Sequence, residues 1–555
     1  MQTALALLLA FLPSPVPHHG IQLAPPAACA LELAPAEDAA ALLPADAVGL
    51  VRLASLRSAL EPWLRLAQDE PLSLEQALGE LAGDPQSREL LAALDFDRPV
   101  ALALRLGDGG EPQFVVVVPC ADPAAVAAQA GGVFPGVTVR ATAEHLVIES
   151  APFEAGASAP AAWASLATHD SAAWLDVAGL RRAFGPLIET ALGAIEGELD
   201  AASDTDPAAA AALEQVDEAR TLIDAAQQLE LFVDWRGGRL ESGLSLALGD
   251  ERWTKTRFGE RTYDISALGR LMDLGAAASS ASVGDGRRTF EQLDLFLDAL
   301  PADVPAEVAP LIELARGVLE PLRASESHAT VSNLRLGVDG IEVTQYIGCP
   351  QPQALVDGLT QWLGLEAWNQ LGVSFQGPQE SLAGGAAWRE YAGRIDVREM
   401  ARKLAPDEPV DDAELAQAQR AFDALFGARG LRLGFATTEQ FAVLRVGGEA
   451  SGASEALARL TRPEPALPPT LAQALASADG ACSAAVFQLD LGRLLEQVEL
   501  FAAGLGESLD TPLALRGESL QLTAYGAVAP RRVHGGFALD TAQLRRWVRA
   551  LEQER

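Results

Sequence analysis

The segment Val-Phe-Gln-Leu-Asp-Leu at residues 486–491, followed by Leu494, decides the predicted fold. Its apolar run has the length and composition of a strand, and Asp490 stands where that strand would pass into a helix. An aspartate at a helix start caps the free N–H groups and favours the positive end of the helix. The segment therefore predicts a strand followed directly by a helix, with Asp490 as its N-cap.

The same pattern recurs along the chain. The other copies are residues 173–177 with Leu180, 262–265 with Leu268, 393–397 with Met400 and, without the aspartate, 48–53 with Leu56. Asp176, Asp264 and Asp396 hold the position of Asp490. A metal or acid–base role would require separate units to bring these carboxylates together, so we predict that all four are structural helix N-caps. The recurrence indicates internal repeats.

Each copy is followed by a helical stretch and then by two apolar runs that predict a hairpin. The clearest turns contain Asp-Gly or Gly-Gly, which suit positive φ angles, and lie at 108–110, 237–238 and 339–340. Asp122-Pro123 then starts a helix, because Asp caps it and Pro fits its first turn. The sequence predicts an α+β fold of about five tandem strand–helix–strand–strand–helix units, forming antiparallel or mixed sheets covered by helices.

The units divide the chain into three parts after the leader. A first repeat pair is expected at 44–250, a second at 258–449 and a single C-terminal unit at 467–555. Cys120 and Cys349 follow matching hairpins of the two pairs, and we consider a disulfide between them. Residues 275–286 are rich in Gly, Ala and Ser and are expected to form a flexible loop.

The first 30 residues predict an exported protein. They contain no charged residue, residues 4–12 have the length of a signal-peptide core, and Ala28-Cys29-Ala30 resembles a cleavage site. We expect a signal peptide or disordered leader at 1–30 and a periplasmic or extracellular location, with lipoprotein anchoring through Cys29 as an alternative. No apolar run reaches the roughly 18 residues of a membrane span, so no transmembrane span is expected in the mature chain.

Composition and charge restrict the class of protein. The 555 residues include 41 Lys and Arg against 76 Asp and Glu, a net charge of −35, with 49% hydrophobic residues and a mean hydropathy of +0.13. This much apolar material excludes a disordered acidic tail. A strongly negative chain without a basic stripe repels phosphate, so we exclude nucleic acid as a partner.

The motifs of common enzymes are missing from the sequence. His145, His169, His328 and His534 stand singly, without the spacing of a zinc site, and no G-x-S-x-G elbow or phosphate loop occurs. His169-Asp170-Ser171 has the letters of a catalytic triad, but triads are assembled in space and not from neighbours in sequence. We predict no catalytic, cofactor-binding or metal-binding residue and no cofactor.

Two charged clusters carry alternative interpretations. The acidic run at 196–206 could bind calcium but lacks the glycine and closing glutamate of an EF-hand, so a solvated helix–helix connection is preferred. The basic cluster of Arg252, Lys255, Arg257 and Arg261 could bind an anionic glycan or lipid headgroup, or balance an acidic surface as a charged loop. We prefer the charged loop.

The opening of the folded part, Leu-Pro-Ala-Asp-Ala-Val-Gly-Leu-Val at 43–51, resembles the LPADT-like opening of a family of uncharacterised bacterial exported proteins. The valine-rich run at 114–118, which precedes the Asp122-Pro123 helix, is similar to a strand of the same family. The family has no established activity. The resemblance implies export and the fold type.

These observations predict an exported cell-envelope protein of non-enzymatic binding or scaffold type. Its partner is open, with an envelope protein or a glycan as candidates. The alternative is a cryptic hydrolase or metal-dependent enzyme whose site is assembled between units. A third hypothesis is an assembly or chaperone-like partner of outer-envelope proteins.

Overall fold

The computed structural model describes residues 37–553 except 68–72, 82–87, 90–91, 108, 131–136, 154–159, 161, 204–206, 288–308, 326, 338–339, 405–411, 428–429, 449–450, 462–465 and 505–516. The predicted leader at 1–30, including Cys29, lies outside the described residues.

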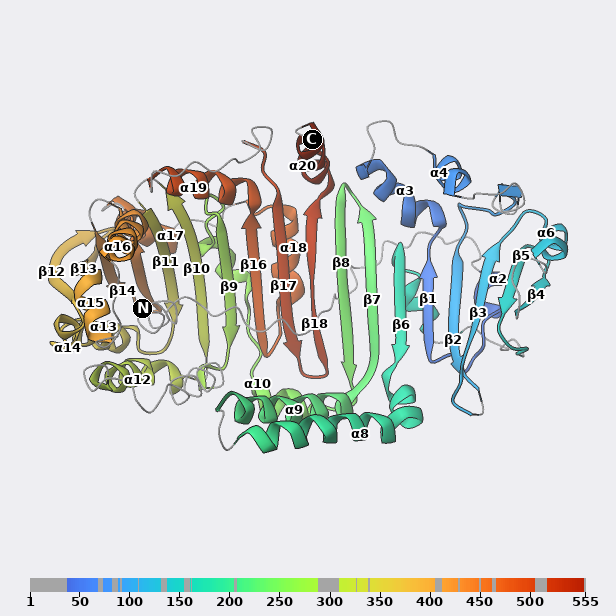
Figure 1. The fold of residues 1–555 in the computed structure, drawn as a ribbon, viewed down its shortest axis with the longest axis horizontal. Helices are drawn as coiled ribbons and strands as arrows, with labels where there is room; N and C mark the ends of the chain where they lie inside the picture. The colour runs from blue at the N-terminus through green and yellow to red at the C-terminus, as the bar shows by residue number, and fades with distance from the viewer. Residues whose placement is uncertain are drawn as a thin grey trace.

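Within the described ranges, eighteen strands pair side by side in one sheet (Figure 1). From one edge toward the centre the order is β4 (Thr138–Ala141), β5 (His145–Glu149), β3 (Pro112–Pro119), β2 (Val100–Leu106), β1 (Gly49–Leu53), β6 (Ser171–Asp176), β7 (Ala226–Arg236) and β8 (Arg239–Leu248). The centre consists of β18 (Arg532–Asp540), β17 (Gln521–Ala529) and β16 (Ser483–Asp490).

The other end of the sheet continues from β16. Its order is β9 (Ala278–Gly284), β10 (His328–Gly337), β11 (Gly340–Gly348), β15 (Phe441–Gly447), β14 (Leu431–Thr437), β13 (Ala386–Ile395) and β12 (Val373–Ala383). Every pair in this order is antiparallel. The predicted α+β class is confirmed, with the antiparallel form of the sheet.

Five groups of three consecutive strands share one connectivity. In each group a helical connection separates the first and second strands, and a hairpin joins the second to the third; the groups start at β1, β6, β9, β13 and β16. The groups join through their first strands at β1–β6 and β9–β16, and through their third strands at β8–β18 and β11–β15. Each group therefore pairs with an edge strand of another group that would otherwise be exposed. The C-terminal group lies at the centre of the sheet.

The third group corrects two predictions. The expected flexible loop at 275–286 contains β9, which pairs on both sides with β10 and β16. The expected strand before Asp264 is only a single bridge between Tyr263 and Ala481. The aspartate that follows this group's first strand is Asp285, whose Oδ1 accepts a 2.9 Å bond from the N–H of Arg287. Small residues have weak strand propensity, and pairing with two neighbours overrides it here.

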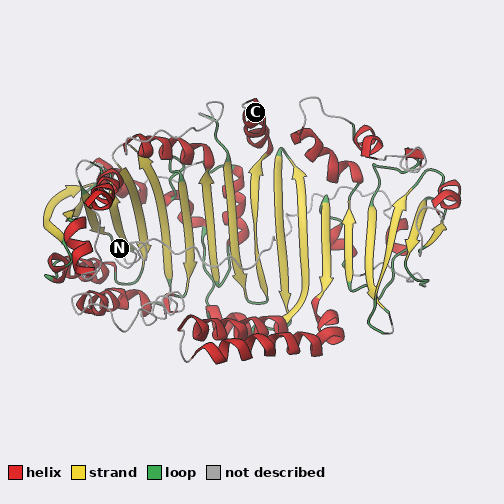
Figure 2. Ribbon diagram, in the orientation of Figure 1, coloured by secondary structure: helices red, strands yellow, loops and turns green. Residues whose placement is uncertain are grey.

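The helices cover parts of both faces of the sheet and both ends of its strands (Figure 2). One face, which we call the α18 face, packs against α2 (Glu37–Ala41), α7 (Trp163–Leu166), η1 (Ser266–Leu271), α17 (Ser451–Thr461) and α18 (Pro469–Ala478). Opposite it, at the β11–β14 end, lie α12 (Ala309–Arg323), α13 (Pro352–Leu363), α14 (Ala367–Gln370) and α16 (Asp412–Phe426), the last preceded by α15 (Val397–Leu404).

The remaining helices border the strand ends. Along the top of Figure 1 run α3 (Leu56–Ala67), α19 (Leu491–Gly504) and α20 (Thr541–Gln553), with α4 (Leu74–Leu81) beside α3. Along the bottom run α8 (Val177–Ser203), α9 (Pro207–Ala225) and α10 (Arg252–Phe258). The short α6 (Pro123–Ala130) packs beside β4 and β5.

The main cores lie on opposite sides of the sheet. On the α18 face, Leu471 and Leu475 of α18 pack in one buried cluster with Val486, while Leu50 packs with Trp163 of α7 in another. On the other side, Trp362 of α13 belongs to a cluster with strand residues of β11, β14 and β15. Between β2 and β16, that second side has no comparable buried cluster among the described residues.

Candidate functional site

The four predicted capping aspartates make the same local contact. In each, Oδ1 accepts a bond from the backbone N–H three residues later: at 2.9 Å for Asp176, 3.4 Å for Asp264, 3.0 Å for Asp396 and 3.1 Å for Asp490. Asp490 is buried, and its Oδ2 also accepts a 2.8 Å bond from the Ser519 hydroxyl. Asp176, Asp396 and Asp490 end the first strand of three groups or follow it, and each binds its own helix start, whereas Asp264 precedes β9 and makes the longest of the four bonds, beside η1.

The considered disulfide between Cys120 and Cys349 is not formed, because both thiols are free. Cys120 is buried beside α6, and Cys349 is buried among residues of α12 and α13. The strands that precede them, β3 and β11, are eleven places apart in the sheet, or about 50 Å, whereas a disulfide needs Cα atoms within about 7 Å. Matching places in two chain segments are therefore distant in the folded sheet.

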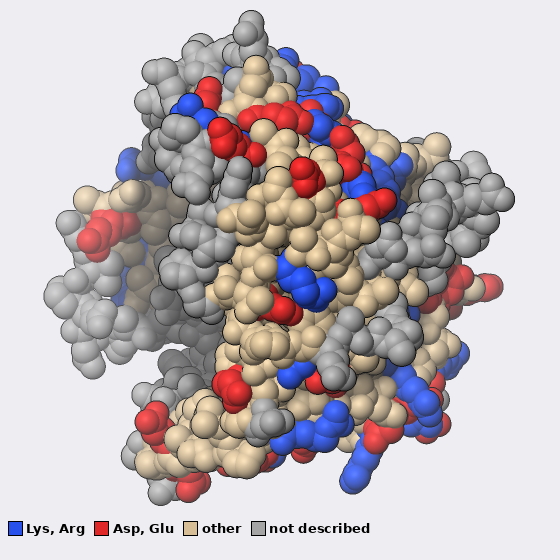
Figure 3. Space-filling model, turned by 90° about the vertical axis from the view of Figure 1, so that its right-hand side faces the viewer, with Lys and Arg blue, Asp and Glu red and all other residues tan. Residues whose placement is uncertain are grey.

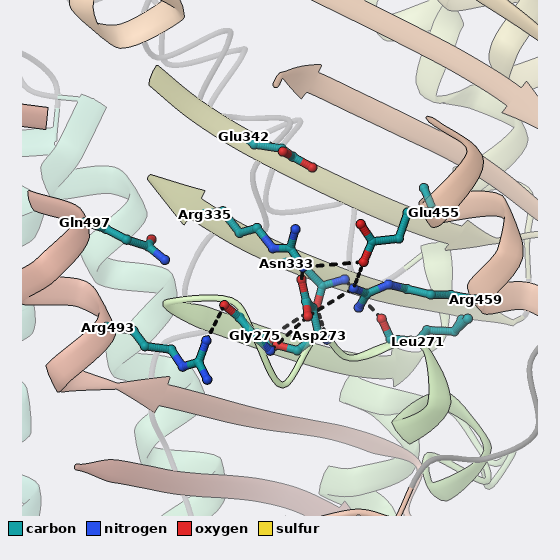
Figure 4. Close-up of polar contacts among 12 residues, drawn as sticks. Leu271, Asp273, Gly275, Asn333, Arg335, Glu342, Glu455, Arg459, Arg493 and Gln497 are labelled. Atoms are coloured by element: carbon teal, nitrogen blue, oxygen red, sulfur yellow. Dashed lines mark hydrogen bonds and ion pairs between the residues drawn. The ribbon is translucent and has the colours of Figure 1, made fainter. Parts of the chain in front are cut away.

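A dense polar cluster surrounds Asp273, between η1 and β9 (Figure 4). Its carboxylate lies 2.5 Å from Arg335 of β10 and 3.0 Å from Arg459 of α17. Glu455 contacts the same two guanidinium groups, at 2.9 Å from Arg459 and 3.6 Å from Arg335. Burial opposes the Arg459 charge, but Asp273 and Glu455 keep the pKa of its guanidinium above the usual value.

Asn333 connects this cluster to the backbone. Its Oδ1 accepts bonds from the N–H of Asp273 at 2.7 Å and the Ser279 hydroxyl at 2.9 Å, and its Nδ2 donates to the carbonyl of Leu271 at 3.0 Å. These bonds attach the segment before β9 to β10. Because the acids and bases of the cluster bind one another, we interpret it as a structural clasp.

His169 finds a partner that is distant in sequence. Its Nδ1 lies 2.7 Å from Oδ2 of Asp234 on β7, and its ring stacks on Phe232. The other oxygen of Asp234 accepts a 2.7 Å bond from the N–H of Asp170, and Asp170 in turn accepts one from the N–H of Trp235. The three-letter resemblance to a triad therefore corresponds to a side-chain network that links the start of β6 to β7.

The charged clusters are paired with opposite charges. In the basic cluster, Lys255 contacts Glu251 and Glu260, and Arg257 contacts Glu218 of α9 at 2.8 Å. Glu196 of the acidic run lies on α8 and pairs with Arg220 of α9. The expected charged loop is wrong for Arg252, Lys255 and Arg257, which lie on the helix α10. Residues 196–203 of the acidic run belong to the end of α8 and not to a connection, and 204–206 lie outside the described residues.

Over the described residues, no group of three or more His, Cys, Asp or Glu is arranged to hold a metal ion. In the same part of the chain, no helix is both long and apolar enough to cross a membrane.

The distinctive surface is the sheet face opposite α18. Directly paired residues of antiparallel strands point to the same side, and alternate residues point to opposite sides. The registers therefore place two adjacent rows across the middle of this face. We call these ten residues the open floor: Leu102, Val51, Ala173, Leu231 and Leu244 in one row, and Val233, Ser242, Phe537, Ala524 and Phe487 in the other.

The large side chains of the open floor are exposed although they are apolar. Val51, Leu102 and Phe487 are each 37% exposed, Phe537 is 40% and Leu231 is 43%. Each row crosses five strands and the two rows share β7 and β8, so the floor is a stepped strip about 34 Å long. At about 4.8 Å between strands and about 6.7 Å between alternate residues, its ten positions cover on the order of 300 Å². Contiguous apolar patches of this size on soluble proteins commonly mark binding sites.

The same strands carry buried polar groups on the α18 face. Arg52 donates a 3.0 Å bond to the carbonyl of His169, Glu241 accepts one from Gln473 of α18, and His534 contacts the carbonyl of Ser477. Some polar groups are thus covered by helices beside the apolar clusters of the α18 face, while apolar groups of the floor face outward. The outward face of a sheet usually carries polar residues, so the apolar floor departs from that arrangement.

Helices border the open floor at both strand ends. At one end Trp63 of α3 packs edge-on against Trp235 of β7, with ring centroids 4.8 Å apart. At the other end Leu222 of α9 and Trp253 of α10 pack with Leu248 and Val533, which point to the floor's side of the sheet. Figure 3 views the β4 end of the molecule: uncharged residues occupy most of its middle, and most charged side chains lie above and below.

The sequence analysis did not identify the open floor. Its signal was the large apolar residue at every second position of β2, β7, β8 and β18, interrupted only by Ser242 on β8 and Gly535 on β18, which is also the pattern of a face that packs into a core. Alternation shows which residues share a face and does not show whether helices cover it.

Comparison with known proteins adds no family. No protein-family model matches the chain, and no curated protein matches it. A solved structure titled "Structure of crystal form III of TP0453" aligns with 41% of this chain and 88% of that chain, at 8% identity and a TM-score of 0.20. At that score the likeness supports no conclusion about fold or function.

Proposed function

We propose that the protein is an exported, non-enzymatic binding protein of the cell envelope and that the open floor is its binding surface. The observation that carries this proposal is a contiguous, uncharged, exposed apolar surface on a rigid sheet. Folding leaves such side chains in contact with water at a cost of about 25 cal/mol per Å², which a ligand that covers them would recover.

The polar clusters support binding over catalysis. The carboxylates of Asp273 and Glu455 are neutralised by arginines, and Asp490 is held by its own helix. A general acid or base needs a free group in a pocket with its proton accessible to a substrate. The proposed ligand site therefore uses apolar contact and not these carboxylates.

An uncharged apolar dye tests the binding surface. N-phenyl-1-naphthylamine fluoresces strongly in apolar surroundings, and we expect saturable binding by the wild type. The double variant Leu231→Glu, Phe537→Glu places two charges on the floor and should bind the dye at least tenfold more weakly. Leu382→Glu is the control, because Leu382 is 83% exposed on β12, away from the floor.

Equal dye binding by the floor variant, with an unchanged circular dichroism spectrum, would contradict the proposal. If the double variant does not fold, the single variants Leu231→Ser and Phe537→Ser replace it.

Export and internal repetition belong to the same proposal. Fractionation of producing cells with N-terminal sequencing should find the mature chain in the envelope or medium, beginning near residue 30; an uncleaved cytoplasmic chain would contradict export.

A further inference from the structure

We infer that the open floor binds the acyl chains of a lipid whose headgroup has no net negative charge. The inference rests on the proposed function and specifies its ligand. It follows from the floor's chemistry, relief, length and borders, and from the charge of the whole chain.

The chemistry of the floor excludes ligands that need hydrogen bonds. Among its ten residues the only polar side chain is that of Ser242, and its strands are paired on both sides, so their backbone groups are already used. Protein interfaces carry about one hydrogen bond per 100–200 Å². A glycan or peptide would leave its polar groups unpaired on this surface, whereas a hydrocarbon chain has none to satisfy.

The relief of the floor suits a narrow flexible ligand. Along the second row, large and small side chains alternate between neighbouring strands: Val233, Ser242, Phe537, Ala524 and Phe487. In the first row Ala173 lies between Val51 and Leu231. Side chains of alternating size suit a methylene chain, which can bend to contact both the large and the small residues, better than a flat or rigid partner, which would touch only the large ones.

The length of the floor matches hydrocarbon chains. The floor extends across eight strands, about 34 Å at an inter-strand spacing of about 4.8 Å. Two acyl chains end to end span the roughly 30 Å hydrocarbon core of a bilayer. One or two chains lying across the strands would therefore contact the floor along their whole length.

The borders and the charge argue against larger apolar partners. The floor lies between α3 at one strand end and α9 and α10 at the other, which hinders a planar membrane from lying on it. A second copy of the chain would bring together two molecules of charge −35. The same negative field repels anionic headgroups and favours lipids that are zwitterionic or uncharged.

Lipid extraction tests the inference. The full-length protein is mixed with vesicles of dioleoylphosphatidylcholine, the vesicles are removed by sedimentation, and phospholipid is measured in the protein fraction. We expect about one lipid or more per wild-type or Leu382→Glu molecule, and at least tenfold less for Leu231→Glu, Phe537→Glu. The conservative Phe537→Leu should retain extraction, and urea unfolding midpoints identify the variants that are folded.

Each outcome separates the two proposals. If the wild type binds the dye but extracts no lipid, the acyl-chain inference is overturned and the proposed binding surface stands. If it neither binds the dye nor extracts lipid, both proposals are overturned. Protein that sediments with the vesicles and extracts no lipid indicates membrane attachment and contradicts the inference.

An anionic lipid tests the headgroup preference. With dioleoylphosphatidylglycerol we expect less extraction than with dioleoylphosphatidylcholine at 20 mM salt and recovery at 500 mM, because salt screens the repulsion. Equal extraction of both lipids at 20 mM salt contradicts the headgroup preference.

Discussion

Two neighbours on β16 provide the sharpest prediction about the faces of the sheet. Val486 points to the α18 face and is 0% exposed, whereas Phe487 points to the open floor and is 37% exposed. The changes are Val486→Asp and Phe487→Asp. The first removes about 2 kcal/mol of apolar burial and places a carboxylate without a partner beneath α18, which costs several kcal/mol more. We expect a loss of at least about 4 kcal/mol in the free energy of unfolding.

Phe487→Asp should cost far less although it removes the larger side chain. Water reaches the floor, so the new carboxylate remains hydrated, and only the contacts with neighbouring strands are lost, about 1–2 kcal/mol. Urea unfolding followed by circular dichroism measures both variants, with Val486→Ala and Phe487→Ala as controls for the lost side chain. A loss for Phe487→Asp as large as for Val486→Asp would mean that this face is covered, and would refute the reasoning.

Other groups provide independent predictions. Burial lowers the pKa of His328 from 6.5 to about 4, so the unfolded chain binds the proton more readily than the folded one. The free energy of unfolding should therefore fall by about 3 kcal/mol as the pH drops from 6.5 to 4. In urea melts over this pH range, His328→Gln should lose less stability than the wild type. Asp490→Ala should cost about 2 kcal/mol of stability, because Asp490 is buried and also binds Ser519. Asp396 is exposed, so Asp396→Ala should cost about 1 kcal/mol. Equal losses of the two variants in thermal melts would argue against this difference. Asn333→Ala leaves the N–H of Asp273 and the carbonyl of Leu271 unpaired, whereas the Ser279 hydroxyl keeps its 3.0 Å bond to the carbonyl of Asp273. The substitution should cost about 2 kcal/mol in urea, and a loss below about 1 would show that the clasp is unimportant.

Local signals predicted much of the fold. The segments around Asp176, Asp396 and Asp490 form a strand followed directly by a helix, and Gly237-Gly238 joins β7 to β8 with positive φ at both glycines. These features depend on neighbours in sequence: the cap bond spans three residues and the turn spans two. Such short-range contacts are readable from a single chain.

Contacts between distant segments could not be predicted. The strand β9 is built of Ala, Ser, Val and Gly, and its sequence resembles a loop; it is a strand because β10 and β16 pair with it on both sides. The pairing of β8 with β18 joins segments nearly 300 residues apart in the chain, at Gly243 and Gly536 for example. No local pattern identifies that partner.

The candidate site was missed for a related reason. Along β8, Leu244 and Leu246 alternate with Ser245, and the usual interpretation buries the leucines, but both leucines are half-buried and Ser245 is buried. In the structure α18 covers the side of Glu241 and Ser245, because Gln473 of α18 binds Glu241. The position of one helix from a segment more than 200 residues away decides which face is open.

The central claim is that the open floor is accessible to water and is covered by bound lipid. The most direct measurement is the rate at which N-ethylmaleimide labels Leu231→Cys in a Cys29→Ser background, since Cys120, Cys349 and Cys482 are buried. Ala172→Cys, on the neighbouring strand β6 but facing α7, is the control. We predict fast labelling of Cys at 231 without lipid, at least tenfold slower labelling with saturating dioleoylphosphatidylcholine, and slow labelling at 172 throughout. Slow labelling at 231 without lipid, or labelling unchanged by lipid, would contradict the account.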